Sequence, residues 1–192
     1  MNYPNGIKKQ EKRLNITYKN RGMNLENDLN LTNLYYKENK IAYIYKKPTP
    51  IKVVKATYND KGNRVIKEAY YSEASTTDYN GIYNGYYIDY EAKETRNKTF
   101  FPLSNIHKHQ IEHIKNVVSM KGICFLIIRF TILEKTFLLK AEDFLEYIKE
   151  NRNSSIPLTF FEEKGYSIKY KLLKPVDYLE IIDKIGGCYE KK

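Results

Sequence analysis

Cysteine is scarce in this sequence, and no long apolar run is present. The two cysteines, Cys124 and Cys188, share no metal-like spacing, so neither a disulfide framework nor a zinc site is supported. The longest apolar run, residues 122–128, is far shorter than the roughly 18 residues that a membrane span needs. The N-terminus is polar and basic and lacks the apolar segment of a signal peptide. These absences predict a cytoplasmic protein with no membrane partner.

Acidic residues are in the minority, with 23 Asp and Glu against 33 Lys and Arg. The formal net charge of +10 and the pI of about 9.3 favour a polyanionic partner such as nucleic acid. The alternative is an ordinary basic protein from a Lys-rich, AT-rich genome. Apolar residues make up 42% of the 192 residues, which is enough for a core and suits one globular domain.

Charge and hydrophobic periodicity divide the chain into a basic flexible N-terminal arm, residues 1–21, and a single domain, residues 22–192. Helices are expected at about 23–39, 105–120, 141–150 and 175–185, with Ser104 as the N-cap of the second. Extended segments are expected at 41–45, 51–56, 65–71, 86–94, 123–130, 137–140 and 166–170, with turns at 59–63 and 75–81. This order predicts an α/β fold in which a mixed central sheet is flanked by helices.

The strand predicted around Glu91 carries the most informative polar residues. Because strand side chains alternate between faces, Asp89, Glu91 and Lys93 point one way. The opposite, core face carries Ile88, Tyr90 and Ala92. Two carboxylates can hold a hard divalent ion, and a neighbouring lysine can orient water or neutralise charge on a phosphate. This combination suits phosphodiester hydrolysis. Spacing alone leaves either Asp78 or Asp89 as the partner of Glu91, and a solvated edge-strand face remains the alternative.

The helix expected at 105–120 raises two questions about ligands. Gln110 interrupts an inward apolar stripe, which indicates either a satisfied core amide or an oxygen that joins a metal shell or contacts the substrate. His107, His109 and His113 invite a zinc interpretation, because the last two share one helix face. No third ligand follows at a convincing spacing, so histidines that face a phosphate backbone are the favoured interpretation.

A second basic region lies between residues 46 and 67, where seven basic residues face one acidic residue around a turn cluster at 59–63. The seven are Lys46, Lys47, Lys52, Lys55, Lys61, Arg64 and Lys67.

Several adjacent segments, taken together and in order, resemble the RecU family of Holliday-junction resolvases. The segments are Asn20-Arg-Gly-Met-Asn-Leu-Glu26, Glu73-Ala-Ser-Thr-Thr-Asp-Tyr-Asn-Gly81, Ile88-Asp-Tyr-Glu-Ala-Lys-Glu-Thr95, Phe101-Pro-Leu103 and His109-Gln-Ile-Glu-His113. The resemblance implies a restriction-endonuclease-like PD-(D/E)xK fold with a projecting basic stalk at about 51–75. It also implies a Mg²⁺-dependent homodimer, with Mn²⁺ as a substitute metal, that cuts four-way junction DNA symmetrically in recombination and repair.

The resemblance also assigns roles to residues. Thr76, Asp78, Glu91 and Gln110 look like metal ligands, and Lys93 looks like the group that stabilises the transition state, so Asp78, Glu91 and Lys93 form the catalytic set. Glu26 matches an acidic position that supports the active site. The candidate DNA-binding residues are Arg21, Lys55, Lys61, Arg64 and Lys67. Recombinase or branch-migration proteins are implied as partners. Two departures are the missing proline before Asp78, where Thr77 stands, and an arm of only about twenty residues.

Two other functions compete with junction resolution. One is a PD-(D/E)xK nuclease of another DNA specificity, such as a restriction-like enzyme on duplex DNA. The other is a non-catalytic DNA-binding module that aids annealing and binds with strong salt dependence without cutting. The intact set of Asp78, Glu91 and Lys93 argues against the second alternative.

Overall fold

The computed structural model describes residues 24–48, 50–71 and 76–185 of the chain. The predicted arm, including Arg21, and Cys188 lie outside the described residues. The helices are α1 (Leu25–Glu38), α2 (Lys108–Ser119), α3 (Ala141–Glu150), α4 (Leu158–Lys164) and α5 (Tyr178–Ile185). The strands are β1 (Ala42–Lys46), β2 (Ile51–Tyr58), β3 (Arg64–Tyr71), β4 (Tyr79–Tyr83), β5 (Tyr86–Thr95), β6 (Phe100–Pro102), β7 (Ile123–Phe130), β8 (Lys135–Lys140), β9 (Ser155–Pro157) and β10 (Tyr166–Ile168).

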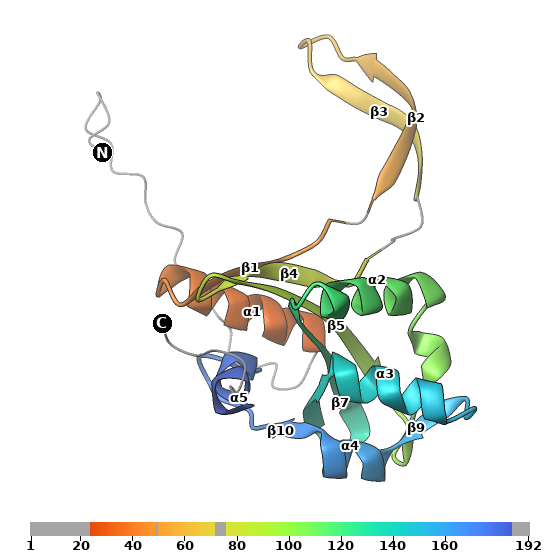
Figure 1. Cartoon of the computed structure of the whole chain (residues 1–192). Helices are drawn as coiled ribbons and strands as arrows, with labels where there is room; N and C mark the ends of the chain where they lie inside the picture. Colours follow the sequence, from red (N-terminus) through yellow and green to blue (C-terminus); the bar gives the residue numbers. More distant parts are fainter. Residues whose placement is uncertain (1–23, 49, 72–75, 186–192) are drawn as a thin grey trace.

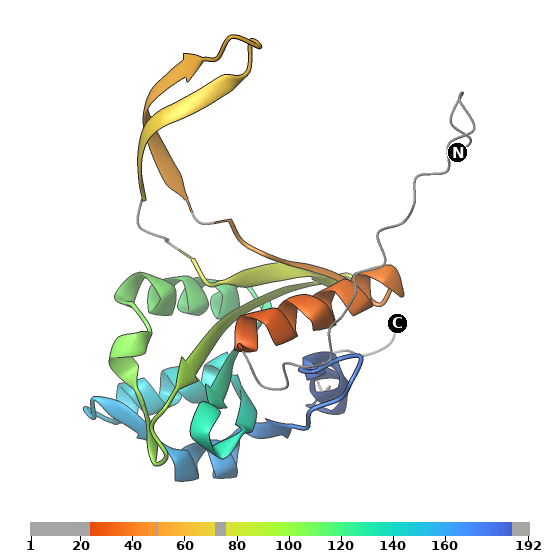
Figure 2. The same ribbon diagram turned by 180° about the vertical axis from the view of Figure 1, so that it is seen from behind.

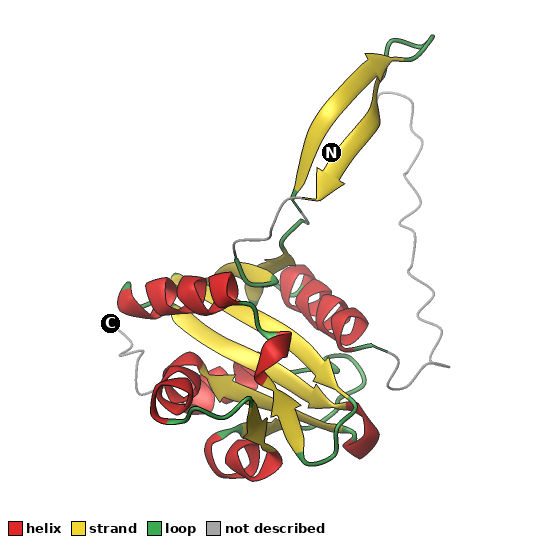
Figure 3. Cartoon of the chain, turned by 90° about the vertical axis from the view of Figure 1, so that its right-hand side faces the viewer, coloured by secondary structure: helices red, strands yellow, loops and turns green. Residues whose placement is uncertain are grey.

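Six strands form the central sheet in the order β1-β4-β5-β7-β8-β10 (Figure 1). The β5–β7 pair is parallel, and the other neighbouring pairs are antiparallel, which confirms the predicted mixed sheet. Residues of α1 and α5 pack on one face of the sheet. Residues of α2, α3 and α4 pack on the other face, so the fold has three layers; Figure 3 shows strands and helices in separate colours. The α/β class predicted from sequence is therefore confirmed.

Central strand β7 is covered on both faces of the sheet. Its Phe125 and Ile127 belong to the core beneath α1 and α5, whereas Leu126 and Ile128 belong to the core beneath α2 and α3. A strand covered on both faces needs a continuous apolar run, and residues 123–128 provide one. Asp89 and Glu91 of neighbouring β5 are also buried, so each carboxylate requires a partner.

Strands β2 and β3 form a separate two-stranded sheet that projects from the body (Figure 2). The turn that joins them is closed by Asn59, whose Oδ1 accepts hydrogen bonds from the amides of Lys61 and Asn63. Gly62 follows with φ of 74°, a left-handed conformation that glycine adopts without steric cost. The predicted extended segments and the turn at 59–63 thus build one hairpin, called the stalk below.

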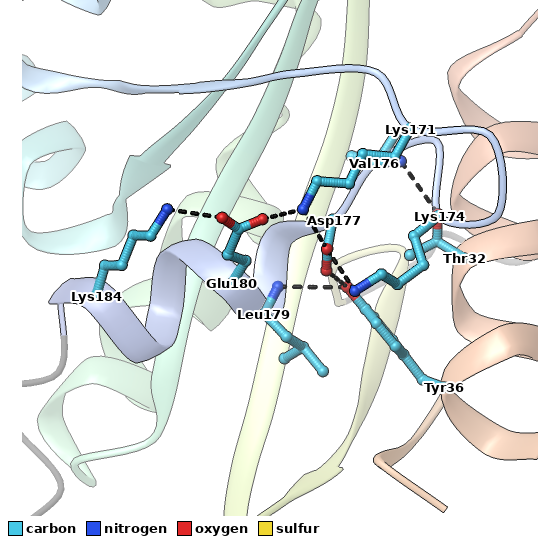
Figure 4. A network of polar contacts seen from close by, with 9 residues as sticks. All are labelled: Thr32, Tyr36, Lys171, Lys174, Val176, Asp177, Leu179, Glu180 and Lys184. Carbon is cyan, nitrogen blue, oxygen red and sulfur yellow. Dashed lines mark hydrogen bonds and ion pairs between the residues drawn. The ribbon is translucent and has the colours of Figure 1, made fainter. Parts of the chain in front are cut away.

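The α5 helix is fastened to α1 by a polar network around Asp177 (Figure 4). Tyr36 Oη donates to Asp177 Oδ1 at 2.7 Å, and the ammonium groups of Lys171 and Lys174 lie 2.9 and 2.6 Å from Oδ2. Burial by itself would raise the pKa of Asp177, but the hydrogen bonds from Lys174, Tyr36 and Lys171 outweigh it and lower that pKa. The carboxylate therefore stays charged at the α1–α5 contact.

The structure corrects several sequence-based boundaries. The sequence predicts a turn over 75–81, but Tyr79–Tyr83 is strand β4, because its residues pair with β1 and β5. Ser104 lies in a short 3-10 helix, and the N-cap of α2 is His107. Helix α4 is absent from the sequence-based prediction, since it has only seven residues, and α5 begins at Tyr178, three residues after Pro175. None of the helices in the described ranges is long and apolar enough to cross a membrane.

Candidate active site

The β4–β5 hairpin brings the two carboxylates predicted for catalysis together. Tyr79 pairs with Tyr90, so Asp78 follows as the neighbour of Glu91 at the open end of the hairpin. The amide of Ala92 donates to Asp78 Oδ2 at 3.4 Å. Lys93 Nζ lies 2.6 Å from Glu91 Oε1 and 3.9 Å from Asp78 Oδ2. Asp78 and Glu91, thirteen residues apart in sequence, are therefore neighbours across the β4–β5 pair.

The Glu91 side chain is fully buried, and one of its oxygens is free. Burial raises the pKa of Glu91 to about 8, and the negative charge of Asp78 contributes to this rise, against the opposing effect of Lys93. Glu91 Oε1 is bonded to Lys93 and Gln110, whereas Oε2 has no hydrogen-bond partner among the described residues. A buried carboxylate oxygen without a partner is costly unless something else binds it.

A divalent cation fits this donor set. Its binding would satisfy Glu91 Oε2 and offset the repulsion between Glu91 and Asp78, and hard cations prefer carboxylate oxygens. Within the described ranges no group of three or more His, Cys, Asp or Glu is placed to hold a metal. Any further ligands from the described residues would therefore be neutral oxygens, such as a hydroxyl, an amide or a backbone carbonyl.

Gln110 is placed beside Glu91, but its amide oxygen has another partner. The side chain is buried on α2, and Nε2 donates to Glu91 Oε1 at 2.8 Å. Gln110 Oε1 accepts the amide hydrogen of His107 at 2.9 Å and so closes the N-terminus of α2. The position suits the predicted metal ligand, and that role would require the amide to turn its oxygen towards Glu91.

The other predicted positions lie around the same carboxylates. Half-buried Thr76 stands two residues before Asp78, at the end of the stalk's returning chain. Glu26 lies in the first turn of α1 and forms a 2.6 Å ion pair with Lys46. A cleft of about 170 Å³ is lined by Glu26, Asp78 and Lys93, which places Glu26 at the candidate site.

Asp89, the alternative partner of Glu91, belongs to a separate buried cluster. Its carboxylate accepts hydrogen bonds from Thr77 Oγ1, from Lys47 Nζ at 2.8 Å and from Tyr87 Oη at 2.6 Å. His113 Nε2 lies 3.1 Å from Asp89 Oδ2. Burial would raise the pKa of Asp89, but these hydrogen bonds, with Lys47 first, hold it below its usual value. Asp89 is thus neither solvated, as an edge-strand face would be, nor beside Lys93.

The three histidines do not form a metal site with one another. His113 contacts Asp89, whereas His107 stacks on His109 with ring centroids 5.4 Å apart. The zinc interpretation therefore has no support in the described part of the chain.

The stalk carries the predicted DNA-binding cations on its surface. The side chains of Lys55, Lys61, Arg64 and Lys67 are all exposed. Large apolar side chains are exposed beside them, including Tyr58 at 75% and Tyr70 at 60%. An isolated hairpin with this composition presents cations and aromatic rings together, which suits contact with a nucleic acid.

Comparison with known proteins identifies the family. The family model described as "RecU: Recombination protein U" matches residues 20–184. This chain belongs to the RecU family. Among RecU relatives, a protein of Pediococcus pentosaceus is 48% identical, and the match covers 96% of each chain. A relative from Oceanobacillus iheyensis is 47% identical over 96% of this chain and 99% of its own. A Staphylococcus aureus relative is 47% identical over 96% of each chain. All three are named Holliday junction resolvase RecU.

Sequence reasoning missed several residues that shape this RecU site. It places Lys46 and Lys47 only in a basic region, yet they contact Glu26 and Asp89. Glu94 Oε1 accepts the amide hydrogen of Leu25 and so ties α1 to β5. The position of Lys46 at the end of a strand could have indicated that it lies near the site. Its contact with Glu26 could not be predicted, because the two residues are distant in sequence and meet only in the fold.

The raised pKa of Glu91 leads to a prediction for the metal-free protein. Folded Glu91 has a pKa of about 8 against an ordinary value of 4.5, so the folded state binds this proton more tightly between the two values. In EDTA, the free energy of unfolding should therefore fall as pH rises through this range. In Glu91→Gln that part of the fall should disappear. Urea denaturation of both proteins measures this, and identical pH profiles would contradict the assignment.

Proposed function

We propose that this chain is a metal-dependent endodeoxyribonuclease that resolves four-way Holliday junctions by symmetric phosphodiester hydrolysis in recombination and DNA repair. The observation that carries the proposal is the buried Glu91 carboxylate, which has a free oxygen and stands beside Asp78 and Lys93. The names of the relatives support junction DNA as the substrate.

Mg²⁺ is the proposed metal, and Mn²⁺ is the proposed substitute. Asp78 and Glu91 would hold the ion, with the hydroxyl of Thr76 and the amide oxygen of Gln110 as neutral ligands. When bound, such a metal polarises the phosphate and lowers the pKa of water. Because Glu91 must be deprotonated to act as a ligand, binding below pH 8 would release its proton.

Lys93 is the proposed group that stabilises the transition state. Its ammonium lies between the two carboxylates, at 2.6 Å from Glu91 and 3.9 Å from Asp78, and its side chain is 24% exposed. A cation held there is preorganised to donate hydrogen bonds to a phosphoryl oxygen as negative charge develops on it. Glu26 would support the site by fixing Lys46 at the edge of the same cleft.

The remaining assignments concern how the junction is held. The proposed division is a DNA-contacting N-terminal arm, residues 1–21, and a nuclease domain, residues 22–192, that carries the stalk. Two equivalent strands must be cut, and a homodimer with two symmetric sites meets that need.

Recombinase or branch-migration proteins remain the proposed partners. Chromosomal DNA is the source of such junctions, so the cytoplasm is the proposed location.

The proposed function predicts cutting that depends on metal and on DNA structure. With Mg²⁺ or Mn²⁺, the protein should make paired symmetric cuts in a labelled four-way junction and leave a matching linear duplex intact. EDTA should abolish cutting. Asp78→Asn should slow it by more than the roughly 10- to 100-fold effect of removing a group that only supports a metal ligand. Gel analysis of the labelled strands measures these rates.

Asp143→Asn is the matched control, because Asp143 lies in the first turn of α3 on the body of the protein. It should cut at the wild-type rate. Cutting of duplex and junction at equal rates would indicate a nuclease of another specificity. Binding without cutting in every metal would leave the non-catalytic module as the function.

If the stalk binds the junction, loss of its positive charges should weaken DNA binding without changing the rate of the cleavage step. We expect neutralisation of Lys55, Lys61, Arg64 and Lys67 to glutamine to weaken junction binding and to flatten its salt dependence. The slope of log K against log salt should fall by about 0.9 for each phosphate that the protein no longer neutralises. The single-turnover cleavage rate at saturating protein should not change. A control with the same charge change neutralises exposed lysines of the body: Lys98, Lys121, Lys149 and Lys164. Unchanged affinity in the stalk variant would contradict the assignment.

A further inference from the structure

Lys47, which precedes the stalk in the chain, and Thr77 and Asp78, which follow it, meet at the open end of the β1–β4 ladder. The outgoing chain leaves at Lys47, directly after β1, and the returning chain arrives through Thr77 and Asp78, directly before β4. The amide of Lys47 donates to the carbonyl oxygen of Asp78 at 2.8 Å. The chain that supports the stalk is thus the same chain that carries two of the proposed metal ligands, Thr76 and Asp78.

Asp89 contacts both Lys47 and Thr77. Lys47 Nζ lies 2.8 Å from Asp89 Oδ2 and 2.9 Å from Thr77 Oγ1, and Thr77 Oγ1 donates to Asp89 Oδ1. Asp89 and Thr77 are 0% and 2% exposed, and the side chain of Lys47 is 16% exposed, so the Asp89–Thr77 contact is fully buried. Such buried polar contacts are strong and directional, because no water competes for the donors.

Strand β5 and helix α2, which contact Asp89, also position Glu91. Asp89 precedes Glu91 by two residues on β5, so both side chains lie on the face covered by α2. On α2, Gln110 contacts Glu91 and His113 contacts Asp89, which joins helix and strand at two successive points. Tyr87 Oη donates to Asp89 from the same strand at 2.6 Å. Asp89 therefore connects α2 and β5 with Lys47 and Thr77.

We propose that Asp89 is a positioning residue that holds Thr76 and Asp78 against Glu91 by binding Lys47 and Thr77. Asp89 does not touch the proposed metal; it acts through Thr77, whose chain neighbours are the ligands on either side. This inference rests on the proposed metal site. It predicts that removal of the Asp89–Thr77 hydrogen bond weakens metal binding even when no DNA is present.

The test measures Mn²⁺ binding to the full-length, DNA-free protein by electron paramagnetic resonance. Asp89→Asn and Thr77→Val should weaken Mn²⁺ binding by about 10- to 100-fold, the usual effect of removing a group that supports a metal ligand. Thr77→Ser keeps the hydroxyl and should restore wild-type affinity. Thr77→Val removes no charge, so it keeps the test valid if Asp89→Asn does not fold.

Asp177→Asn is the matched control for general destabilisation. Asp177 is also buried and also bound by a tyrosine and lysines, but it lies at the α1–α5 contact (Figure 4). It should lower the thermal unfolding temperature without changing Mn²⁺ affinity. Wild-type affinity in both Asp89→Asn and Thr77→Val would overturn the inference, as would an equal loss of affinity in Asp177→Asn. Absence of Mn²⁺ binding to the wild-type protein would instead overturn the metal site on which the inference rests.

Discussion

The buried carboxylate of Glu91 is the constraint around which the site is built. A charge in a dry layer between a sheet and a helix is unfavourable unless it is bonded, and here Lys93 and Gln110 bond only one oxygen. The other oxygen and the nearby charge of Asp78 leave the protein poised to bind a cation. A raised pKa at Glu91 is the expected consequence of that arrangement.

Aromatic packing on the opposite face of the sheet holds these groups in place. Tyr79 stacks on Tyr90 at 4.8 Å, and Tyr90 stacks on Phe125 at 4.9 Å. Tyr79 follows Asp78 in sequence, and Tyr90 precedes Glu91. Packing of these rings on the opposite face of the sheet therefore fixes the strands that carry the two carboxylates. Asn33 on α1 donates to Tyr90 Oη at 3.0 Å and satisfies that buried hydroxyl. Rigid support of this kind is what a metal site requires of its scaffold.

Much of the architecture can be predicted from hydrophobic periodicity. Helix α1 has apolar residues at helical spacing, and apolar and polar residues alternate along strand β5. The short elements β4 and α4 were not predicted, because each is too short to show a clear hydrophobic pattern and is stabilised by neighbouring elements. For the site, spacing identifies Glu91 and Lys93 but leaves Asp78 and Asp89 open. The family resemblance favours Asp78, and the fold gives the physical reason: Asp78 lies near Lys93, whereas Asp89 is bound by Lys47 and Thr77.

Asp78 and Glu91 are the proposed ligands of the catalytic metal, and Mn²⁺ can locate that metal directly. A crystal of the protein soaked in Mn²⁺ would be measured at the manganese absorption edge to place the ion by its anomalous scattering. We expect one or more peaks in contact with Glu91 Oε2 and the Asp78 carboxylate. A peak at Asp89 and His113 instead, with none at Glu91, would contradict it.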